Sequence, residues 1–234
     1  MILTCGTARG QSDIDERSQE IIAGCIEAMG SEMALSAAIE SLEITGTGSL
    51  GAGELSPIII RIKGPEKIWT QYGNGLLVKV INGDVGWFVS PGQAPILHSV
   101  DGQTLRQRGL PLPYAFLAWL EFKGNIRFAG EQQIDDARTW RLEFTNASGG
   151  GIAAFFDQES GMLVRSEKGE LVTEYEFRRV GDIQVLTRVV MRTGMNRDII
   201  EFTEVDFDAD IADDLFKLPP EIKQAVAEQK ESNR

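Results

Sequence analysis

Hydrophobic and polar positions follow two different periods along the chain. Over residues 12–29 apolar side chains recur every three or four residues, and Gly30 follows them. This spacing predicts a helix with one apolar face, capped at its start by Ser12 or Ser18 and ended by the glycine. The apolar positions are Ile21, Ile22, Cys25, Ile26 and Met29. Residues 31–42, SEMALSAAIESL, predict a second short helix that runs into a strand.

From Leu42 onward the period changes to two. In PIIIRIKGP, residues 57–65, Ile58, Ile60 and Ile62 fall on one face of a strand. Similar alternating runs continue to Phe207, and Asn-Gly, Pro-Gly and other glycine-containing turn signals separate them. Short runs of this kind predict an antiparallel meander of about eleven strands. A sheet of that size rarely stays open and flat, so we expect it to be highly curved.

One apolar helical pattern interrupts the strands at mid-chain. Residues 101–124 predict a loop followed by a helix over about 113–122, which carries Phe116, Leu117 and Leu120. A curled sheet must cover its concave side with apolar groups, and the two helical regions can provide them. The predicted fold is therefore mainly β: an unclosed half-barrel, with the N-terminal helix and the mid-chain helix on its concave side.

Composition is that of one globular unit. The chain has 234 residues, 42% hydrophobic and 25% charged, which is enough to bury a substantial core. No composition break divides it. We expect a tail or tether over residues 1–18, a half-barrel domain over 19–219 and a polar C-terminal tail over 220–234. We expect a monomer.

Charge and residue types argue against several classes of function. The net charge is −12, so long-range repulsion disfavours nucleic acid as a partner. One histidine, His98, and two distant cysteines form no zinc-ligand pattern. The aspartates, among them Asp135, Asp136 and Asp206, lack the glycine and terminal glutamate of a calcium loop. We expect no metal, no cofactor and no catalysis, because no nucleophile–base pattern is present.

Several phrases, in this order, resemble a known family. They are AIESLEITGTGSL, GPEKIWTQ, NGDVGWFVSPG, FAGEQQIDDARTWRLEF, FFDQESGMLVRSE and FTEVDFDADIADDLFKLPP, and they fall between about Gln19 and Pro219. The order resembles the LolA-like outer-membrane lipoprotein-sorting proteins of bacterial envelopes. The resemblance implies an unclosed β-barrel whose apolar cavity receives lipid or the acyl chains of a lipoprotein. It also implies a location in the periplasm or on an envelope membrane surface, with membrane association and a role in transport or sorting.

The candidate ligand-binding residues follow from this reading. Inward-facing apolar side chains would line the cavity: Ile58, Ile60, Ile62, Trp87, Phe116, Leu117 and Leu120. A filled core would give the same sequence pattern. The alternative is therefore a structural or interaction module of the cell envelope that binds no ligand.

Cys5 is a candidate lipid-attachment site. It follows a short apolar stretch and precedes Gly6, as at the cleavage site of a bacterial lipoprotein precursor. Four preceding residues are too few for a secretion signal, which needs an apolar stretch of about 7–15 residues. If Cys5 carries lipid, we expect a signal segment upstream of Met1. The alternative is an ordinary exposed cysteine in a tail.

Overall fold

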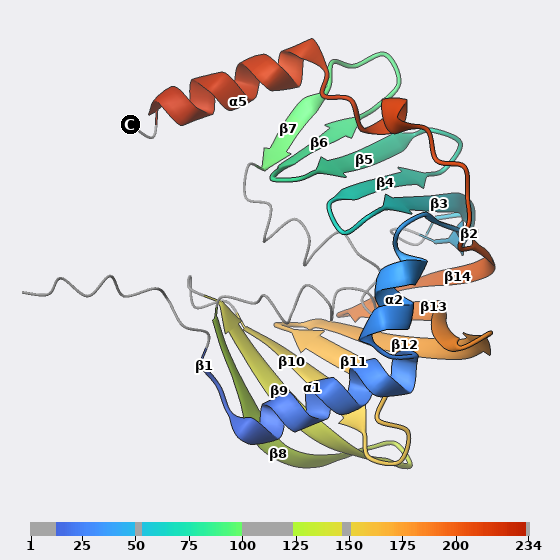
Figure 1. Cartoon of the computed structure of the whole chain (residues 1–234), viewed down its shortest axis with the longest axis vertical. Coiled ribbons are helices and arrows are strands. Elements are labelled where there is room, and N and C mark those ends of the chain that lie inside the picture. The colour runs from blue at the N-terminus through green and yellow to red at the C-terminus, as the bar shows by residue number, and fades with distance from the viewer. Residues whose placement is uncertain (1–12, 50–52, 100–123, 147–150, 233–234) are drawn as a thin grey trace, which may run out of the picture.

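The computed structural model describes residues 13–49, 53–99, 124–146 and 151–232. Its main feature is one continuous 14-stranded sheet with the order β1-β8-β9-β10-β11-β12-β13-β14-β2-β3-β4-β5-β6-β7 (Figure 1). The helix predicted over 113–122, with Phe116, Leu117 and Leu120, and the candidate Cys5 all lie outside the described residues.

The strands are short to medium in length and are joined mostly by tight turns. Their bounds are β1 Asp13–Ile14, β2 Leu42–Gly48, β3 Ser56–Lys63, β4 Lys67–Tyr72, β5 Leu77–Asn82, β6 Val85–Val89, β7 Ile96–Ser99, β8 Gly124–Ile134, β9 Ala137–Asn146, β10 Gly151–Asp157, β11 Leu163–Lys168, β12 Leu171–Val180, β13 Ile183–Thr193 and β14 Asn196–Asp206. The described helices are α1 Glu16–Met29, α2 Glu32–Ala38, the 3₁₀ turn η1 Asp213–Phe216, and α5 Pro220–Ser232.

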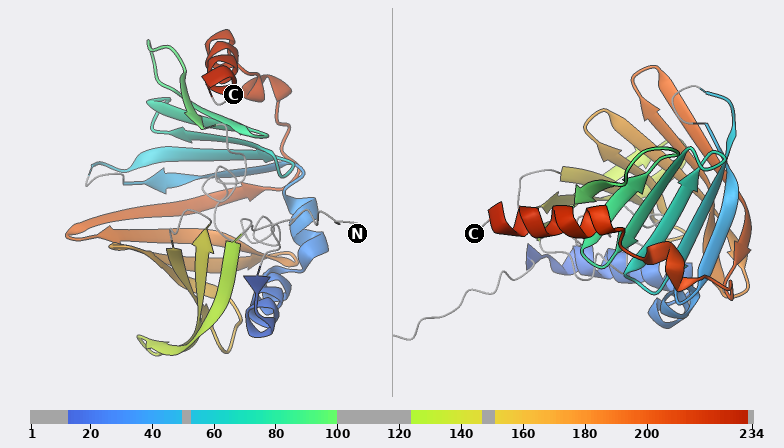
Figure 2. Two further views of the ribbon diagram at one scale, coloured as in Figure 1. Left: turned by 90° about the vertical axis from the view of Figure 1, so that its left-hand side faces the viewer. Right: turned by 90° about the horizontal axis from the view of Figure 1, so that it is seen from above.

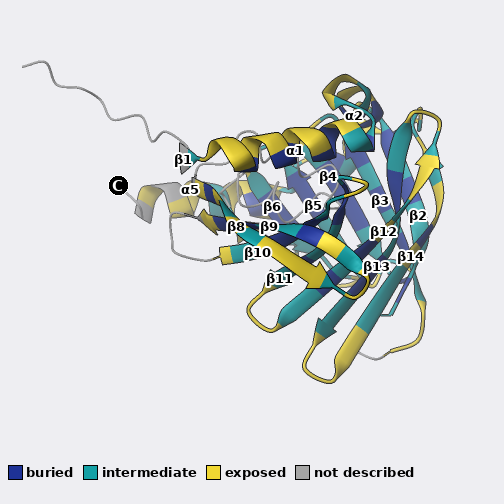
Figure 3. Cartoon of the chain, turned by 90° about the horizontal axis from the view of Figure 1, so that it is seen from below, coloured by how far each residue is buried: buried dark blue, intermediate teal, exposed yellow. Residues whose placement is uncertain are grey.

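The sheet is antiparallel apart from β1, which pairs in parallel with β8. It curves without closing, and α1 lies on the concave side (Figures 1 and 3). The predicted class, a mainly β, unclosed antiparallel half-barrel with an N-terminal helix, is confirmed. Each alternating run predicted as a strand forms one. The additional strands are β1 and β7, which are too short to show a period.

Asp15, rather than Ser12 or Ser18, caps the start of α1. Its carboxylate accepts hydrogen bonds from the Ser18 backbone N–H and the Ser18 hydroxyl, each 2.9 Å long. The serine prediction was wrong because an aspartate three residues before Ser18 offers two acceptors at once. The predicted end at Gly30 is confirmed. This glycine has φ +127°, and a Cβ there would lie 2.5 Å from the Asp182 carbonyl oxygen.

The sheet carries apolar cores on both of its faces. The larger core fills the concave side, where residues of α1 and α2 pack with inward-facing residues of β2–β5 and β8–β14. The smaller core lies on the convex side of β3–β7, because its members alternate along these strands with members of the larger one. Ile59, for example, joins the smaller core between Ile58 and Ile60, which belong to the larger.

The C-terminal segment covers this convex patch. Residues 209–226, which include η1 and the first part of α5, contribute the buried side chains Ile211, Phe216 and Ile222. In Figure 1 this red segment runs along the outside of the β3–β7 half. Asn82 donates a 3.0 Å hydrogen bond from Nδ2 to the Phe216 carbonyl, and Asp213 forms ion pairs with Lys63 and Lys67. The residues expected to be a polar tail thus include a helix with one fully buried side chain.

Ion pairs instead cover much of the convex face of the other half. Cross-strand pairs join arginines and glutamates of neighbouring strands, such as Arg127 with Glu143 at 2.7 Å and Arg188 with Glu176 at 2.6 Å. Among the described residues, the C-terminal segment covers the outer face where that face carries the smaller apolar core, and charged side chains occupy much of it in the other half.

Candidate functional site

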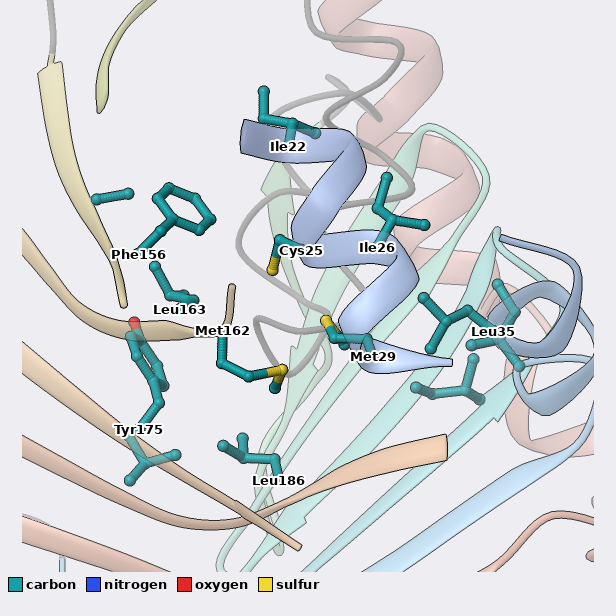
Figure 4. Packing of buried hydrophobic residues seen from close by; sticks show 14 of the residues in the cluster. Ile22, Cys25, Ile26, Met29, Leu35, Phe156, Met162, Leu163, Tyr175 and Leu186 are labelled. Atoms are coloured by element: carbon teal, nitrogen blue, oxygen red, sulfur yellow. The ribbon is translucent and has the colours of Figure 1, made fainter. Parts of the chain in front are cut away.

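Helix α1 occupies the concavity of the half-barrel and brings together the side chains of the candidate site. Its buried face meets the sheet through Cys25 and Met29, which point toward Met162 and Leu163 in Figure 4. Gly161, between β10 and β11, has φ +73°, a backbone conformation that favours glycine. A Cβ there would be in ordinary van der Waals contact with the Gly24 carbonyl oxygen of α1, at 3.5 Å. The helix is therefore held against the β10–β11 turn on one side.

A second face of α1 borders an open pocket of about 480 Å³. The described residues that line it come from β1, α1 and the start of α2: Ile14, Gln19, Ile22, Ala23, Ile26, Glu27 and Glu32. Ile22 and Ile26 point away from the sulfur atoms of Cys25 and Met29 in Figure 4. Both isoleucines are buried, 4% and 6% exposed, and belong to the larger core, so they form the apolar wall where this core meets the pocket.

The polar groups of this pocket are few. Gln19 donates a 3.0 Å hydrogen bond from Nε2 to the Ile14 carbonyl, which ties the side chain to the backbone of β1. Glu27 and Glu32 are exposed and place two carboxylates beside the apolar lining. Such a pocket, apolar with a few polar groups near its opening, suits an amphiphile.

The interior beside α1 favours uncharged groups. Burial raises the pKa of the Cys25 thiol to about 12, so this cysteine stays protonated at neutral pH. Burial likewise raises the pKa of Tyr175 to about 12, although hydrogen bonds from Ser166 and Thr173 oppose the shift. The Tyr175 and Ser166 hydroxyl oxygens lie 2.8 Å apart and satisfy each other. These two groups therefore bring no charge into the concave core.

The predicted cavity residues divide between the two cores. Ile58, Ile60 and Ile62 are all buried on the concave side, in the same cluster as Leu35 and Ile39. They do not line the pocket beside α1. In the described structure they contribute to a packed region, and their contact with a ligand remains a prediction.

Trp87 requires a correction. We expected it near the cavity, but its side chain, only 1% exposed, lies in the smaller core with Ile222 and Phe216. Alternation along β6 shows which residues share a face, but it does not show which face is concave. The apolar C-terminal segment makes the convex side a second interior, so burial alone does not distinguish the two.

Sequence reasoning did not single out the residues that border the pocket. Ile22 and Ile26 were recognised only as part of the helical stripe, and Ala23 and Ile14 were not considered. The sequence offered no separate signal for them. Apolar residues at positions 21, 22, 25, 26 and 29 form one stripe of the width that is ordinary for a helix packed on a sheet.

Metal binding and membrane crossing also bear on the class of site. Within the described residues, no group of three or more His, Cys, Asp or Glu side chains is arranged to hold a metal ion. No single described helix is long and apolar enough to cross a membrane. Helices α1 and α2, which are bent by 56° relative to each other, are together long and apolar enough by length and composition only.

Comparison with known proteins defines the fold. No family model matches the chain, and neither does any curated protein. Among solved structures, a LolA superfamily protein from Nitrosomonas europaea has a TM-score of 0.54 at 13% identity, over 80% of this chain and 97% of that one. A DUF1329 family protein from Desulfovibrio piger has a TM-score of 0.57 at 8% identity, over 85% and 96% of the two chains.

A third structure is similar to the same extent. A domain from Vibrio parahaemolyticus, described as an outer membrane lipoprotein-sorting protein, has a TM-score of 0.59 at 11% identity and covers 85% of this chain and 97% of its own. The chain therefore has a LolA-like fold, as the order of its sequence phrases predicted. At these identities the likeness concerns the fold alone.

Proposed function

We propose that this protein binds lipid, or the acyl chains of a lipoprotein, in the apolar pocket beside α1, and that it serves transport or sorting in the cell envelope. The observation that carries the proposal is the open pocket of about 480 Å³ bordered by Ile22, Ala23 and Ile26. Its volume falls within the range of roughly 300–1,000 Å³ that is typical of small-molecule sites.

The position of the pocket supports an amphiphilic ligand. An acyl chain would lie against Ile22 and Ile26 at the edge of the larger core and would remove their remaining apolar surface from water. The polar end would remain near Gln19, Glu27 and Glu32, within reach of solvent. The proposed activity is reversible binding, in which no covalent bond forms or breaks.

The location is part of the same proposal. The Vibrio neighbour is described as an outer membrane lipoprotein-sorting protein. A lipid carrier in the periplasm or on an envelope membrane would be close to the membranes that contain its ligand. Lipid attachment at Cys5 would hold the domain at that membrane. Mass spectrometry of the N-terminal peptide from native membranes tests this part: an unmodified Cys5 thiol would contradict it.

The binding experiment uses a substitution at the edge of the pocket that reduces its volume. Ala23 is exposed and borders the pocket, so Ala23→Trp would fill the space while leaving the core intact. We expect the affinity for a fluorescent fatty acid, measured by titration, to fall on the order of tenfold, which corresponds to about 1.4 kcal/mol. Gly24→Ala is the matched control, because a Cβ there meets nothing within 4 Å and Gly24 does not line the pocket.

The outcomes separate binding from its absence. Organic extraction of the purified protein should release bound lipid, and Gly24→Ala should bind the probe as the native chain does. Equal affinities for all three proteins would show that the probe binds elsewhere. No probe binding and no extracted lipid would contradict the proposal.

One observation favours the second candidate, a module that binds no ligand. Much of the concave face is filled, since Leu35, Ile39 and Met29 pack with the inward-facing isoleucines of β3. A protein whose interior is complete would act through its surface. Failure of the binding experiment would support this alternative.

A further inference from the structure

At one end of the curved sheet, three loops and the first residue of β7 each carry a large, exposed apolar side chain. Leu55 precedes β3, Leu76 ends the turn between β4 and β5, Ile96 begins β7, and Met195 lies in the turn between β13 and β14. Their exposed fractions are 66%, 70%, 59% and 103%. We call these four residues the apolar rim.

Strand register places the four side chains along the same edge. The residue pairs next to the turns connect across the sheet: Thr193 with Asn196, Ile200 with Gly48, Gly48 with Ser56, Ile58 with Tyr72, Tyr72 with Leu77, and Val78 with Val89. Neighbouring strands are about 4.8 Å apart, so successive hairpin tips lie about 10 Å apart and the rim extends roughly 30 Å. In the left view of Figure 2 these hairpins point to the side opposite α2.

The loops of the rim are almost free of charge. Their described parts are residues 53–55, 73–76, 90–95 and 194–195, and Glu54 is the only charged residue among them. The whole chain has a net charge of −12 and is one-quarter charged. These described loops therefore carry little charge that would have to leave water, or be repelled, at an apolar or anionic surface.

Single exposed apolar side chains are ordinary on a protein surface. Their distribution here is not even, because four of the five large exposed hydrophobic residues in the described part of the chain belong to the rim. The fifth, Met33, lies on α2. Helix α2 sits at the other end of the strands, where the Gly64 backbone N–H donates a 2.9 Å hydrogen bond to the Ile39 carbonyl.

We propose that the apolar rim docks on the surface of a lipid bilayer, with Leu55, Leu76 and Met195 entering the interface. Separate side chains on hairpin tips suit a fluid surface, since each can enter it without a complementary pocket. A protein partner would instead require a continuous patch or a groove, and the pocket beside α1 includes none of the rim residues. The docking surface does not depend on the proposed ligand.

The test is a flotation assay of the full chain with two kinds of vesicle, phosphatidylcholine alone and phosphatidylethanolamine mixed with phosphatidylglycerol. The native chain should float with both, and binding should persist at high salt, because apolar insertion is not screened. The triple variant L55S/L76S/M195S should bind at least about tenfold more weakly, since it removes three inserted side chains.

Met33→Ser is the matched control, because it removes an equally exposed apolar side chain at the opposite end. It should bind as the native chain does. The single variants Leu76→Ser and Met195→Ser should each show part of the loss, which keeps the test decisive if the triple variant folds poorly. Circular dichroism and urea unfolding should confirm the fold of every variant.

Several results would overturn the proposal. They are a native chain that does not float, a triple variant that floats unchanged, and a Met33→Ser variant that loses as much binding as the triple variant. Binding that disappears at high salt would indicate electrostatic attraction instead of insertion. A native dimer that the triple variant dissociates, without vesicle binding, would assign the rim to contact between copies.

Discussion

At the scale of single residues, Trp87 lies between strands β5 and β7 and packs in the same core as the C-terminal segment. It pairs across the sheet with Val80 on one side and Leu97 on the other, and it shares its core with Phe216 and Ile222. A tryptophan buried at such a position contributes through many close contacts, so its removal leaves a cavity that its neighbours cannot fill. The side chain therefore links the outer strands to the C-terminal segment.

The first prediction concerns this residue. Trp87→Ala should lower the free energy of unfolding by about 3–5 kcal/mol, measured by urea denaturation. Trp140→Ala is the control. This tryptophan is only half-buried beside Arg17, whose guanidinium lies 4.9 Å from the ring, so its loss should cost less. Because Trp87 faces the convex side, fatty-acid affinity should not change. Reduced affinity with unchanged stability would contradict the placement.

At the scale of elements, Asp15 forms hydrogen bonds with both the start of α1 and the sheet. One carboxylate oxygen accepts the Ser18 backbone N–H, and the other accepts the Ser18 hydroxyl and, at 2.7 Å, the Phe128 backbone N–H of β8. Partial burial opposes ionisation, but these hydrogen bonds outweigh it and lower the pKa of Asp15 below its usual value of 3.8. The residue is thus both a helix cap and a connection to the strand near the edge.

The second prediction follows from the direction of this shift. A carboxyl group with a lowered folded-state pKa stabilises the fold fully above its unfolded pKa, and the contribution is lost as pH falls through the folded pKa. At neutral pH Asp15→Ala should cost about 1 kcal/mol, and its deficit relative to the native chain should shrink below about pH 4. Urea unfolding across this range measures both effects.

Asp15→Asn is the informative control. Asparagine can cap a helix but does not titrate, so this variant should retain much of the stability at neutral pH without the acid-dependent part. An equal deficit for Asp15→Ala at every pH would show that the carboxylate charge contributes nothing.

The elements also show how far the sequence predicts the fold. Alternation in runs such as residues 57–65 predicted the strands, and the stripe ending at Met29 predicted α1, because each pattern reflects one buried face. The two-residue β1 and four-residue β7 were missed, since so few residues establish no period. The role of Ile222 was missed for a similar reason, because one buried residue in a polar helix leaves almost no pattern.

The candidate site was harder to predict than the fold. Which isoleucines share a face follows from their spacing, but the identity of the concave face depends on the curvature of the whole sheet. Trp87 was misplaced for this reason. The pocket residues Ile22 and Ile26 belong to the same apolar stripe of α1 as Cys25 and Met29, so spacing alone does not distinguish them. A pocket depends on what packs nearby, and local spacing carries no information about that.

At the scale of the whole molecule, the sheet connects two differently covered halves. Strand β14 pairs with six residues of β2, with one register shift, so the strand pairing continues from the α1 half to the C-terminal half. The concave core crosses the same boundary, since it includes both Phe156 of β10 and Ile81 of β5. Neither half therefore has a core of its own on the concave side.

The last prediction is that the described structure unfolds as one unit. Urea transitions followed by far-ultraviolet circular dichroism and by tryptophan fluorescence should coincide, because separating the halves would expose the shared core. Trp69 and Trp87 report on the convex core, whereas Trp140 packs against the concave one, so fluorescence of single-tryptophan variants can compare the two regions directly. Two separated transitions, with the Trp69 and Trp87 signals changing first, would show that the C-terminal segment and strands β3–β7 form an independent unit. A single transition would instead mean that ligand binding beside α1 stabilises the convex core as well, because both belong to the same cooperative equilibrium.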